Sequence, residues 1–452
     1  MKIAAHTLGC KLNSAETSTI VEQFRRREWD VISDPNSADV YLLNTCSVTA
    51  NAERECRQIV RRVLRENPNA FIAVTGCYAQ LRPEEIASIE GVDVVLGAKE
   101  KFDLFSSIDR FEKLDAPRIF SSPIEEATDF HLAATSDTSE RTRAFLKVQD
   151  GCDYTCSYCT IPMARGASRS TEANQILAEA RRLCNDGFAE IVLSGVNVGD
   201  YGVKDGTSFY ELLCALEADE AVTARIRISS IEPNLLTDEI ISLMASSKKI
   251  CPHVHVPLQS GSDTILRLMQ RRYNTAAYRE RIEKVKAAMP HCAIGIDVIV
   301  GFPGETDELF EECFDFLQSL DLSYLHVFTY SERPDTKAAV LKGRVEKDIR
   351  KERNARLRIL SEKKRQAFYR SQYSKHGTVL LEDEDSCSTI SLKREGFTEH
   401  YVRVAIDRTL LPETALIVKV ELLGVDGDAV TAVPIEVLSH RKSEPSLLPI
   451  LQ

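Results

Sequence analysis

The sequence predicts an α/β protein with an N-terminal open parallel α/β domain, a central partial (βα)6 barrel and a C-terminal small antiparallel β-barrel. Its 452 residues exceed what one hydrophobic core normally organises, so several domains are expected. Buried strand patterns alternate with amphipathic helical patterns well past the middle of the chain, which is typical of parallel sheets. Short strands separated by turn residues then follow, which is typical of small antiparallel barrels.

The first domain is expected over residues 1–125. Apolar runs in it are followed by helical patterns, as in an open parallel sheet. Pro83 suits the first turn of a helix, and the acidic residues that follow it favour a helix N-terminus. The predicted strands are Lys2–Leu8, Ala38–Asn44 and Ala70–Thr75, and the predicted helices are Leu12–Glu28, Ala50–Glu66 and Pro83–Ile89.

The second domain is expected over residues 138–372, after a linker at Ser121–Glu140 that is rich in Ser, Thr, Asp and Glu. Strand-like runs recur in it, and helical patterns separate most of them. Repeated βα units of this kind predict a partial barrel whose site lies at the carboxyl ends of the strands. The predicted strands are Ala144–Gln149, Ile191–Ser194, Ile226–Ile231, His253–Val256, Ile294–Val300 and Tyr324–Thr329.

A long charged helix from Val345 to Tyr373 is expected to close the second domain. The small barrel then occupies residues 373–438, and residues 439–452 are expected to form a flexible tail. Turn residues between the short apolar runs favour antiparallel pairing. The predicted strands are Thr378–Glu382, Ser388–Lys393, Tyr401–Ile406, Ala415–Leu423 and Ala429–Pro434.

Composition narrows the class of protein. No apolar run reaches the length of a membrane span, and the N-terminus lacks the pattern of a signal peptide, so a cytoplasmic protein is expected. In a reducing compartment, thirteen cysteines indicate metal ligands or core thiols rather than disulfides. The net charge of −11 argues against a uniformly basic nucleic-acid binder but leaves room for local basic surfaces.

A cysteine motif follows the first strand of the predicted barrel. Cys152, Cys156 and Cys159 have C-x3-C-x2-C spacing, and no fourth cysteine lies nearby. Three thiolates on one loop can bind three irons of a 4Fe–4S cubane and leave the fourth iron open. S-adenosylmethionine can chelate that iron and then be cleaved to a 5′-deoxyadenosyl radical. The alternatives are a zinc site, which would need a fourth ligand, and three core thiols.

Further residues near this motif and at the strand ends fit a cofactor pocket. Tyr158 is placed to pack on an adenine, and glycine at a strand end permits close approach of a ligand. Ordinary turn chemistry is the alternative for each of these positions. Isolated cysteines elsewhere in the domain (Cys184, Cys214, Cys251, Cys292 and Cys313) are interpreted as structural. The candidate cofactor-binding residues are Tyr158, Ser194, Gly195, Ser229, Glu232, Asp297 and Gly301.

A second set of cysteines is spread over the first domain. Cys10, Cys46 and Cys77 each follow a predicted strand and precede a helical pattern. Such positions share the carboxyl edge of a parallel sheet, where ligands bind, and helix N-termini stabilise thiolates there. The set therefore predicts a second 4Fe–4S cluster with an open iron. The alternative is three small buried residues at strand ends; Cys56, within a helix, is a poorer candidate.

The barrel motif resembles the signature of the radical S-adenosylmethionine superfamily. Together with the N-terminal cysteines, it makes nearly the whole chain similar to the methylthiotransferase family. The segment from Arg394 to Val404 resembles the small RNA-binding TRAM barrel. The contexts of Cys10 (GCKLN), Cys46 (NTCSVT) and Cys77 (GCYAQ), and the segment SGVNVGDYG at Ser194–Gly202, look most like the branch that modifies N6-threonylcarbamoyladenosine in tRNA.

The resemblance implies two 4Fe–4S clusters, S-adenosylmethionine, a tRNA anticodon arm as partner and an electron donor such as a flavodoxin or ferredoxin. One S-adenosylmethionine would methylate sulfur at the N-terminal cluster. A second would supply the radical that removes hydrogen from C2 of the adenine, before the methylthio group is transferred. The C2–H bond is inert to acids and bases, so no catalytic side chain beyond the cluster ligands is expected. The immediate sulfur source stays open.

A basic stretch is a candidate RNA-binding surface. Between Lys342 and Arg370, twelve Lys or Arg residues stand against four Asp or Glu residues, which suits contacts with phosphates. A solvated amphipathic helix is the alternative. Aromatic residues of the small barrel could stack on bases of the anticodon arm. The candidate RNA-binding residues are Arg353, Lys363, Lys364, Phe397, Tyr401 and Arg403.

Two other functions stay open on the sequence. A methylthiotransferase of the same chemistry could act on N6-isopentenyladenosine in tRNA or on an aspartate of a ribosomal protein. A non-catalytic iron–sulfur or RNA-binding protein would share the cysteines but not the radical chemistry.

Overall fold

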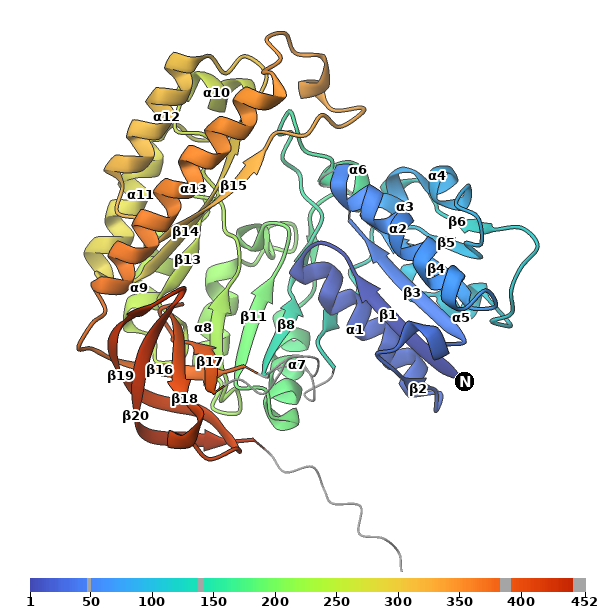
Figure 1. The fold of residues 1–452 in the computed structure, drawn as a ribbon, viewed down its shortest axis with the longest axis horizontal. Helices are drawn as coiled ribbons and strands as arrows, with labels where there is room; N and C mark the ends of the chain where they lie inside the picture. The colour runs from blue at the N-terminus through green and yellow to red at the C-terminus, as the bar shows by residue number, and fades with distance from the viewer. Residues whose placement is uncertain (47–49, 137–141, 383–391, 442–452) are drawn as a thin grey trace, which may run out of the picture.

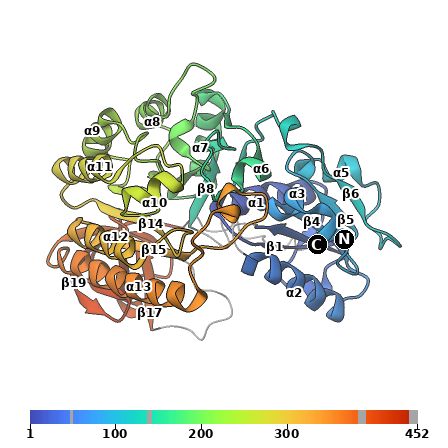
Figure 2. The same cartoon turned by 90° about the horizontal axis from the view of Figure 1, so that it is seen from above.

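The computed structural model describes residues 1–46, 50–136, 142–382 and 392–441, with side chains from residue 54 onwards in the helix that begins at Ala50. Figure 1 shows an N-terminal α/β unit beside a central barrel, with a small β-barrel below. Figure 2 shows α12 (Asp307–Ser319) and α13 (Lys347–Arg370) side by side on the far flank of the central barrel from the N-terminal unit. None of the helices in the described ranges combines the length and apolar character that a membrane span requires.

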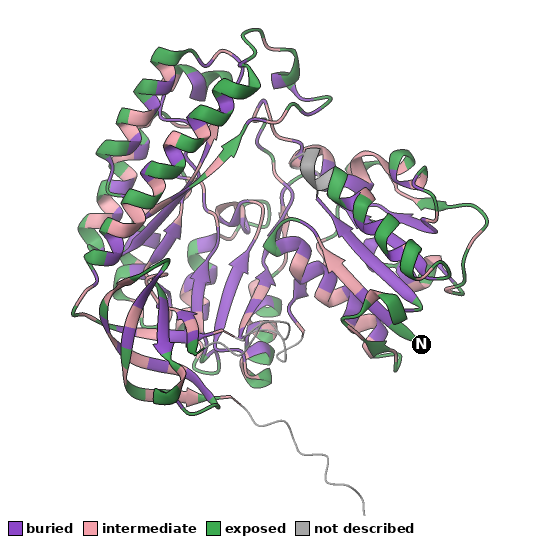
Figure 3. Cartoon of the chain, in the orientation of Figure 1, coloured by how far each residue is buried: buried purple, intermediate pink, exposed green. Residues whose placement is uncertain are grey.

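The N-terminal unit is a parallel sheet with strand order β2-β1-β3-β4-β5-β6. Leu42 of β3 packs in the core with α1, whereas Leu43 packs in the core with α2, because successive strand residues face opposite sides. Figure 3 shows the buried strands between partly exposed helices. The elements are β1 Lys2–Thr7, α1 Lys11–Arg25, β2 Asp30–Val31, β3 Val40–Thr45, α2 Ala50–Glu66, β4 Phe71–Gly76, α3 Cys77–Leu81, α4 Pro83–Ala87, β5 Val94–Leu96, α5 Leu104–Ser107 and β6 Arg118–Phe120.

The strands predicted for this unit are confirmed as β1, β3 and β4, within one or two residues at each end. The edge strands β2, β5 and β6 were not expected. Each has only two or three residues, which is too short for a strand pattern to emerge from sequence. Their pairing with the longer strands, rather than their own composition, makes them strands.

The central barrel consists of parallel strands in chain order and is open on one side. One sheet runs β12-β11-β8-β7 and the other β13-β14-β15, with bridges Ile226–Ile250 and Ser230–His255 between β12 and β13. The elements are β8 Arg143–Lys147, α6 Ile161–Arg165, α7 Ala173–Asp186, β11 Glu190–Ser194, α8 Phe209–Ala218, β12 Arg225–Ile228, α9 Asp238–Ser246, β13 His253–His255, α10 Asp263–Leu268, α11 Thr275–Ala288, β14 Ala293–Val300, α12 Asp307–Ser319, β15 Tyr324–Thr329 and α13 Lys347–Arg370.

All the predicted barrel strands are therefore present. The predicted linker is not wholly irregular, because β7 (Ala133–Ala134) pairs antiparallel with β8 at the sheet edge. A small ribbon of β9 (Gln149–Asp150) and β10 (Arg169–Ser170) brackets the loop that carries Cys152. The core of this unit is formed by apolar side chains of the strands and of the helices outside them.

The C-terminal unit is a closed barrel with order β16-β17-β18-β20-β19. Its pairs are antiparallel as predicted, except β18–β20, which is parallel. A closed ring with an odd number of strands cannot alternate direction throughout, so one pair must be parallel. The strands are β16 His376–Leu381, β17 Lys393–Phe397, β18 Arg403–Asp407, β19 Ala415–Asp426 and β20 Ala429–His440.

Two sequence predictions for this unit need correction. The strand predicted at Ser388–Lys393 lies mostly outside the described residues, and β17 begins only at Lys393. The predicted tail begins two residues too early, because β20 continues through His440, where it still pairs with β19. The rest of that segment, residues 442–452, lies outside the described residues.

Candidate functional site

The cysteine loop of the barrel presents its sulfur atoms to nearby N–H donors. The backbone N–H of Tyr154 donates to Cys152 Sγ at 3.4 Å, and that of Ile161 donates to Cys159 Sγ at 3.4 Å. Arg271 Nη1 donates to Cys156 Sγ at 3.0 Å. Donors of this kind stabilise negative charge on sulfur, as thiolates bound to iron require.

The loop conformation depends on the glycine before the first cysteine. Gly151 has a φ of +69°, and a Cβ there would lie 2.0 Å from the carbonyl oxygen of Ala167. The backbone N–H of Cys152 donates to the carbonyl oxygen of Gly166 at 3.0 Å, and that of Ser157 donates to Met269 at 3.0 Å. The loop is therefore held on both sides by the barrel.

Two thiols of this loop are harder to ionise than a free thiol. Burial raises the pKa of Cys152 to about 12 and that of Cys159 to about 11. Iron binds the thiolate, so binding must supply the free energy of deprotonation. Among the described residues, no three His, Cys, Asp or Glu side chains gather around a single metal-ion position. A cubane fits this finding, because each thiolate binds a different iron and the sulfur atoms need not converge on one point.

A cavity of about 340 Å³ opens beside the cysteine loop at the carboxyl ends of the barrel strands. Its wall contains all three barrel cysteines. Of the predicted cofactor-binding residues, Tyr158, Glu232 and Asp297 line it. This is the position that the fold predicts for a ligand site.

The remaining predicted cofactor residues are not among those that line this cavity, so their assignment stays a prediction. Ser194 is fully buried, and its hydroxyl donates to the carbonyl oxygen of Val192 at 3.1 Å. Gly195 faces the Gln149 side chain, and Ser229 is buried. Gly301 packs against Arg350: a Cβ on Gly301 would lie 2.2 Å from Arg350 Cγ.

The offset between Ser229 and Ser230 agrees with the alternation of side chains along an extended segment. The neighbours Val196, Asn197 and Ser230 line the cavity in place of the predicted positions. A prediction that is right about the strand end but wrong by one residue places the side chain on the opposite face.

Residues that the sequence did not indicate lie in the wall, as Arg271 does, or bond to it from behind, as Tyr273 and His255 do. Arg271 bonds Glu232 as well as Cys156, and Tyr273 accepts from its Nε at 3.0 Å. His255 lies 2.8 Å from Ser230 Oγ through Nδ1 and 3.0 Å from Asp297 through Nε2. Arg271 follows a short helix and not a strand, so the strand-end criterion could not find it.

The N-terminal cysteines lie at the carboxyl ends of β1, β3 and β4, which are adjacent strands. Cys10 is the N-cap of α1 and Cys77 is the first residue of α3. A Cβ on Gly9 would lie 2.9 Å from Cys46 Sγ, so the chain before Cys10 touches Cys46 directly. Burial raises the pKa of Cys77, an effect that the nearby Arg165 opposes.

The isolated cysteines behave as interpreted. Cys251, Cys292 and Cys313 are buried in the barrel, while Cys184 and Cys214 on helices are partly buried.

Two of the predicted RNA-binding residues are already bonded within the protein, Arg353 in a buried and Lys364 in a half-buried position, which leaves them poorly placed for RNA. Arg353 is 5% exposed, and Nη1 donates to the carbonyl oxygen of Glu305 at 3.0 Å while Nη2 bonds Asp307 at 2.6 Å. Lys364 Nζ donates to the carbonyl oxygen of Gln318 at 2.8 Å, at the end of α12. These residues face the barrel because α13 packs along it, which its charge alone did not indicate.

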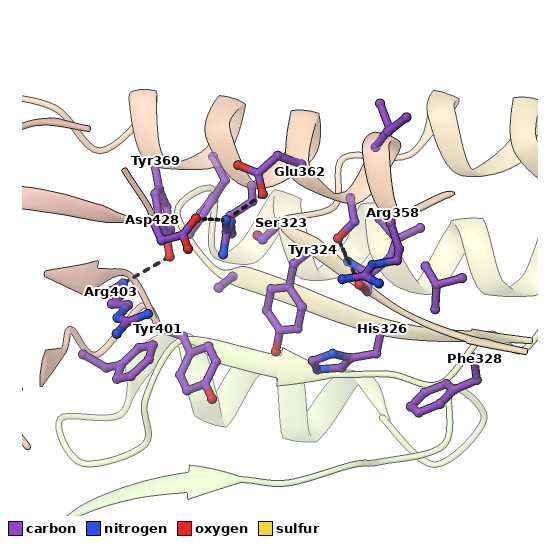
Figure 4. A pocket seen from close by; sticks show the side chains of 18 residues that line it. Ser323, Tyr324, His326, Phe328, Arg358, Glu362, Tyr369, Tyr401, Arg403 and Asp428 are labelled. Atoms are coloured by element: carbon purple, nitrogen blue, oxygen red, sulfur yellow. Dashed lines mark hydrogen bonds and ion pairs between the residues drawn. The ribbon is translucent and has the colours of Figure 1, made fainter. Parts of the chain in front are cut away.

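A second cavity, of about 860 Å³, lies between β15, α13 and the C-terminal barrel. Figure 4 shows Tyr324, Tyr401 and Arg403 around it, with Phe328 at the opposite end. The rings of Phe397 and Tyr401 are stacked, with centroids 4.8 Å apart. Phe328 also lines the cavity beside the cysteine loop, so the two cavities adjoin. Lys363 is exposed on α13 but does not line this groove.

Known proteins resemble the chain over nearly its full length. A family model described as Radical SAM superfamily matches residues 146–317, and one described as Uncharacterized protein family UPF0004 matches residues 2–97. The chain is 38% identical over 448 residues to the threonylcarbamoyladenosine tRNA methylthiotransferase MtaB of Bacillus subtilis (strain 168), with 97% of this chain and 99% of that protein covered. The MtaB protein of Aquifex aeolicus (strain VF5) is 39% identical, with 90% and 100% covered.

More distant proteins share parts of this likeness. The tRNA-2-methylthio-N(6)-dimethylallyladenosine synthase of Helicobacter pylori (strain Shi470) is 30% identical, with 94% of this chain and 97% of that protein covered. The radical S-adenosylmethionine methyltransferase TsrM of Kitasatospora setae superposes with a TM-score of 0.55 at 15% identity, over 75% of this chain and 77% of that chain, and shares the fold. On the strength of the full-length identities, the protein belongs to the methylthiotransferase family of radical S-adenosylmethionine enzymes.

Proposed function

We propose that this enzyme converts N6-threonylcarbamoyladenosine beside the tRNA anticodon to its 2-methylthio derivative. The observation that carries the proposal is the identity of 38–39% to relatives named for this substrate, against 30% to a relative named for the dimethylallyl substrate. The presence of both cysteine sets on one chain supports the two-site chemistry that the product requires.

In this proposal, Cys152, Cys156 and Cys159 hold one 4Fe–4S cluster, and S-adenosylmethionine occupies the adjoining cavity. When bound, the cluster supplies the electron that cleaves the cofactor. Arg271 donates a hydrogen bond to Cys156 and another to Glu232. These polar groups of the cavity wall are therefore already oriented before a ligand binds. Asp297 and Ser230 orient His255 between them, which offers fixed polar groups to a bound ligand.

Cys10, Cys46 and Cys77 hold the second cluster and the sulfur to be transferred. Their place at one sheet edge brings three thiols together from distant parts of the chain. Cys10 is exposed whereas Cys46 and Cys77 are buried, so the site is open on the side of Cys10. An open side is what the delivery of a methylthio group to a substrate requires.

The groove of Figure 4 provides a path for the RNA. Phe397 and Tyr401 offer stacked rings for bases, and Arg403 and the exposed Arg358 offer charge for phosphates. Phe328 is 45% exposed at the junction with the cofactor cavity. A flipped adenine would pass this ring to reach the radical, because a base within its stack cannot.

The partners follow from the same chemistry. The enzyme takes tRNA as substrate and a one-electron donor such as a flavodoxin or ferredoxin as reductant. A cytoplasmic location is part of the proposal, because a tRNA substrate supports it.

Nucleoside mass spectrometry tests the substrate. In tRNA from a strain that lacks this gene and any paralogue, the methylthiolated threonylcarbamoyl nucleoside should disappear, and the gene should restore it. Persistence of that nucleoside, with loss of the methylthiolated dimethylallyl nucleoside, would assign the enzyme to the other tRNA substrate.

A second experiment tests the radical chemistry. Reduced, reconstituted enzyme should form 5′-deoxyadenosine from S-adenosylmethionine, and the Cys156→Ala variant should not. Absence of the product in the reconstituted parent enzyme would point to a non-catalytic iron–sulfur protein.

A further inference from the structure

A cluster of buried ionic side chains joins the N-terminal unit to the barrel. Glu16 Oε1, on α1, lies 2.6 Å from Lys101 Nζ, 3.2 Å from Lys147 Nζ and 3.1 Å from Arg165 Nη1. Asp150 Oδ1 bonds Arg165 Nη1 at 2.9 Å, and its Oδ2 bonds Lys147 at 3.2 Å. All five side chains are at most 4% exposed. We call them the interdomain ion cluster.

On the N-terminal side, Asn13 connects the ion cluster to two cysteine loops. Arg165 Nη2 donates to Asn13 Oδ1 at 2.6 Å. The amide nitrogen of Asn13 then donates to the carbonyl oxygens of Leu8 at 2.9 Å and Thr45 at 3.0 Å. Thr45 directly precedes Cys46, and Leu8 lies two residues before Cys10.

On the barrel side, the ion cluster reaches the other cysteine loop. Asp150 Oδ1 accepts from the backbone N–H of Gly151 at 2.8 Å, directly before Cys152. Arg165 ends α6, and the next residue accepts the N–H of Cys152. One arginine therefore lies between the two candidate cluster sites and is bonded toward both.

The ion cluster carries an excess of positive charge. Lys101, Lys147 and Arg165 stand against Glu16 and Asp150, and uncompensated charge in a protein interior is costly. An anion nearby would balance this excess. Arg165 is close enough to the thiols of Cys10 and Cys77 to interact electrostatically with both.

We propose that Arg165 is a positioning residue that holds the two cysteine sites in fixed register and stabilises negative charge at the N-terminal site. This inference rests on the proposed function, because it takes Cys10, Cys46 and Cys77 as ligands of a cluster. A reduced cluster carries one more negative charge than an oxidised one. The positive charge of Arg165 therefore raises the reduction potential of the N-terminal cluster, and the charge of Glu16 lowers it.

Opposite signs separate this role from a merely structural one. Arg165→Gln and Glu16→Gln break the same interdomain contact; Glu16→Gln keeps the side-chain size, and Arg165→Gln shortens the side chain but keeps it polar. If the contact only held the units together, both variants should shift the potential in the same direction. If charge acts on the cluster, Arg165→Gln lowers the potential and Glu16→Gln raises it.

The experiment uses the full chain with Cys152, Cys156 and Cys159 replaced by Ala, so that only the N-terminal cluster remains. The midpoint potential is measured by a redox titration followed by electron paramagnetic resonance. We expect shifts of opposite sign, each near a tenfold change in the reduction equilibrium, which is about 59 mV for a one-electron couple. Arg165→Lys, which keeps the charge, should remain closer to the parent than Arg165→Gln.

The matched control is Arg169→Gln. Arg169 bonds Asp150 Oδ2 at 3.2 Å, and its other donors bond the carbonyl oxygens of Asp129, Arg165 and Ala167, so it should shift the potential less. Shifts of the same sign for Arg165→Gln and Glu16→Gln, or no shift, overturn the inference. If Arg165→Gln does not fold, Glu16→Gln decides alone, since only a rise agrees with the proposal. Absence of iron in the triple-Ala parent would instead refute the cysteine assignment.

Discussion

Two buried ionic contacts join the barrel to its neighbours, and they differ in where they lie. Toward the N-terminal unit, Glu16 pairs with Lys147 and Arg165 in the interdomain ion cluster, beside the cysteine loops. Toward the C-terminal barrel, Glu190 Oε1 accepts from Arg227 Nε at 2.9 Å and Oε2 accepts from Arg227 Nη2 at 2.9 Å. Glu190 also pairs with Arg225. Both carboxylates are fully buried.

The contacts lie at opposite ends of the barrel strands. Glu190 and Arg225 are the first residues of β11 and β12, at the amino ends. Asp150 and Arg165, in contrast, flank the cysteine loop at the carboxyl ends, where sites in such barrels lie. The amino-terminal contact is therefore expected to serve stability, and the carboxyl-terminal contact to serve chemistry.

The two contacts also differ in the groups that they bond in the neighbouring unit. Arg225 Nη2 donates to the carbonyl oxygen of Phe397 at 3.0 Å, and Arg227 Nη2 donates to that of Thr398 at 3.2 Å. The C-terminal barrel is thus held by its backbone, just beside the stacked ring of Tyr401. The N-terminal unit is held instead through side chains that reach the cysteine loops.

The largest expected difference is chemical. Cys10→Ala should abolish methylthio transfer and leave the formation of 5′-deoxyadenosine at the parent rate, because the barrel loop is intact. Liquid chromatography of both products measures this. Cys56→Ala, a buried cysteine of α2 away from the strand ends, is the control and should retain both activities. Loss of cofactor cleavage in Cys10→Ala with an intact barrel cluster would contradict the division of labour between the sites.

The next effect is on stability. Glu190→Ala leaves arginines without their carboxylate in a buried position, which should lower the free energy of unfolding by about 3–5 kcal/mol. Urea denaturation of the apoprotein measures it. Glu311→Ala, which removes an exposed pair with Arg356 at 2.6 Å, should cause no measurable loss. An equal loss in both variants would show that Glu190 is not the anchor of the C-terminal barrel.

Acid should weaken both contacts. Burial alone would raise the pKa of Glu16 and Glu190, but the cations around them hold both pKa values well below the usual range. A depressed pKa stabilises the fold above the pKa of the unfolded state, about 4.3 for Glu, and this stability is lost as the pH falls below it. Stability of the apoprotein should therefore fall less steeply between about pH 5 and 3 in Glu190→Gln than in the parent. An unchanged slope would contradict the ion pairing.

The smallest effect concerns RNA. Tyr401→Ala should weaken binding of an anticodon stem-loop by about 1–3 kcal/mol, the range for one stacked base, without changing the salt dependence. Arg403→Gln should instead reduce the salt slope by about one phosphate contact. Fluorescence anisotropy at several salt concentrations measures both. Unchanged affinity in both variants would place the RNA outside the groove of Figure 4.

Local patterns in the sequence indicated most residues of the candidate site. The barrel motif is contiguous, so its loop could be recognised without a fold. Cys10, Cys46 and Cys77 could be grouped because parallel strands align their carboxyl ends at one edge. Positions beside a strand end were less reliable. Ser229 was expected in the cavity where Ser230 is found, because one residue along a strand reverses the face.

The sequence alone determined the fold class, the longer strands of each chemistry-bearing unit and the two cysteine sets, because periodicity and spacing express them locally. Only the tertiary structure decided which charged side chains are already bonded within the protein. Arg353 and Lys364 look like RNA ligands in a basic helix, yet both are bonded within the barrel. Glu16 and Arg165 are separated by 149 positions. Their contact depends on how two units pack, and no local pattern encodes the partner of a buried charge.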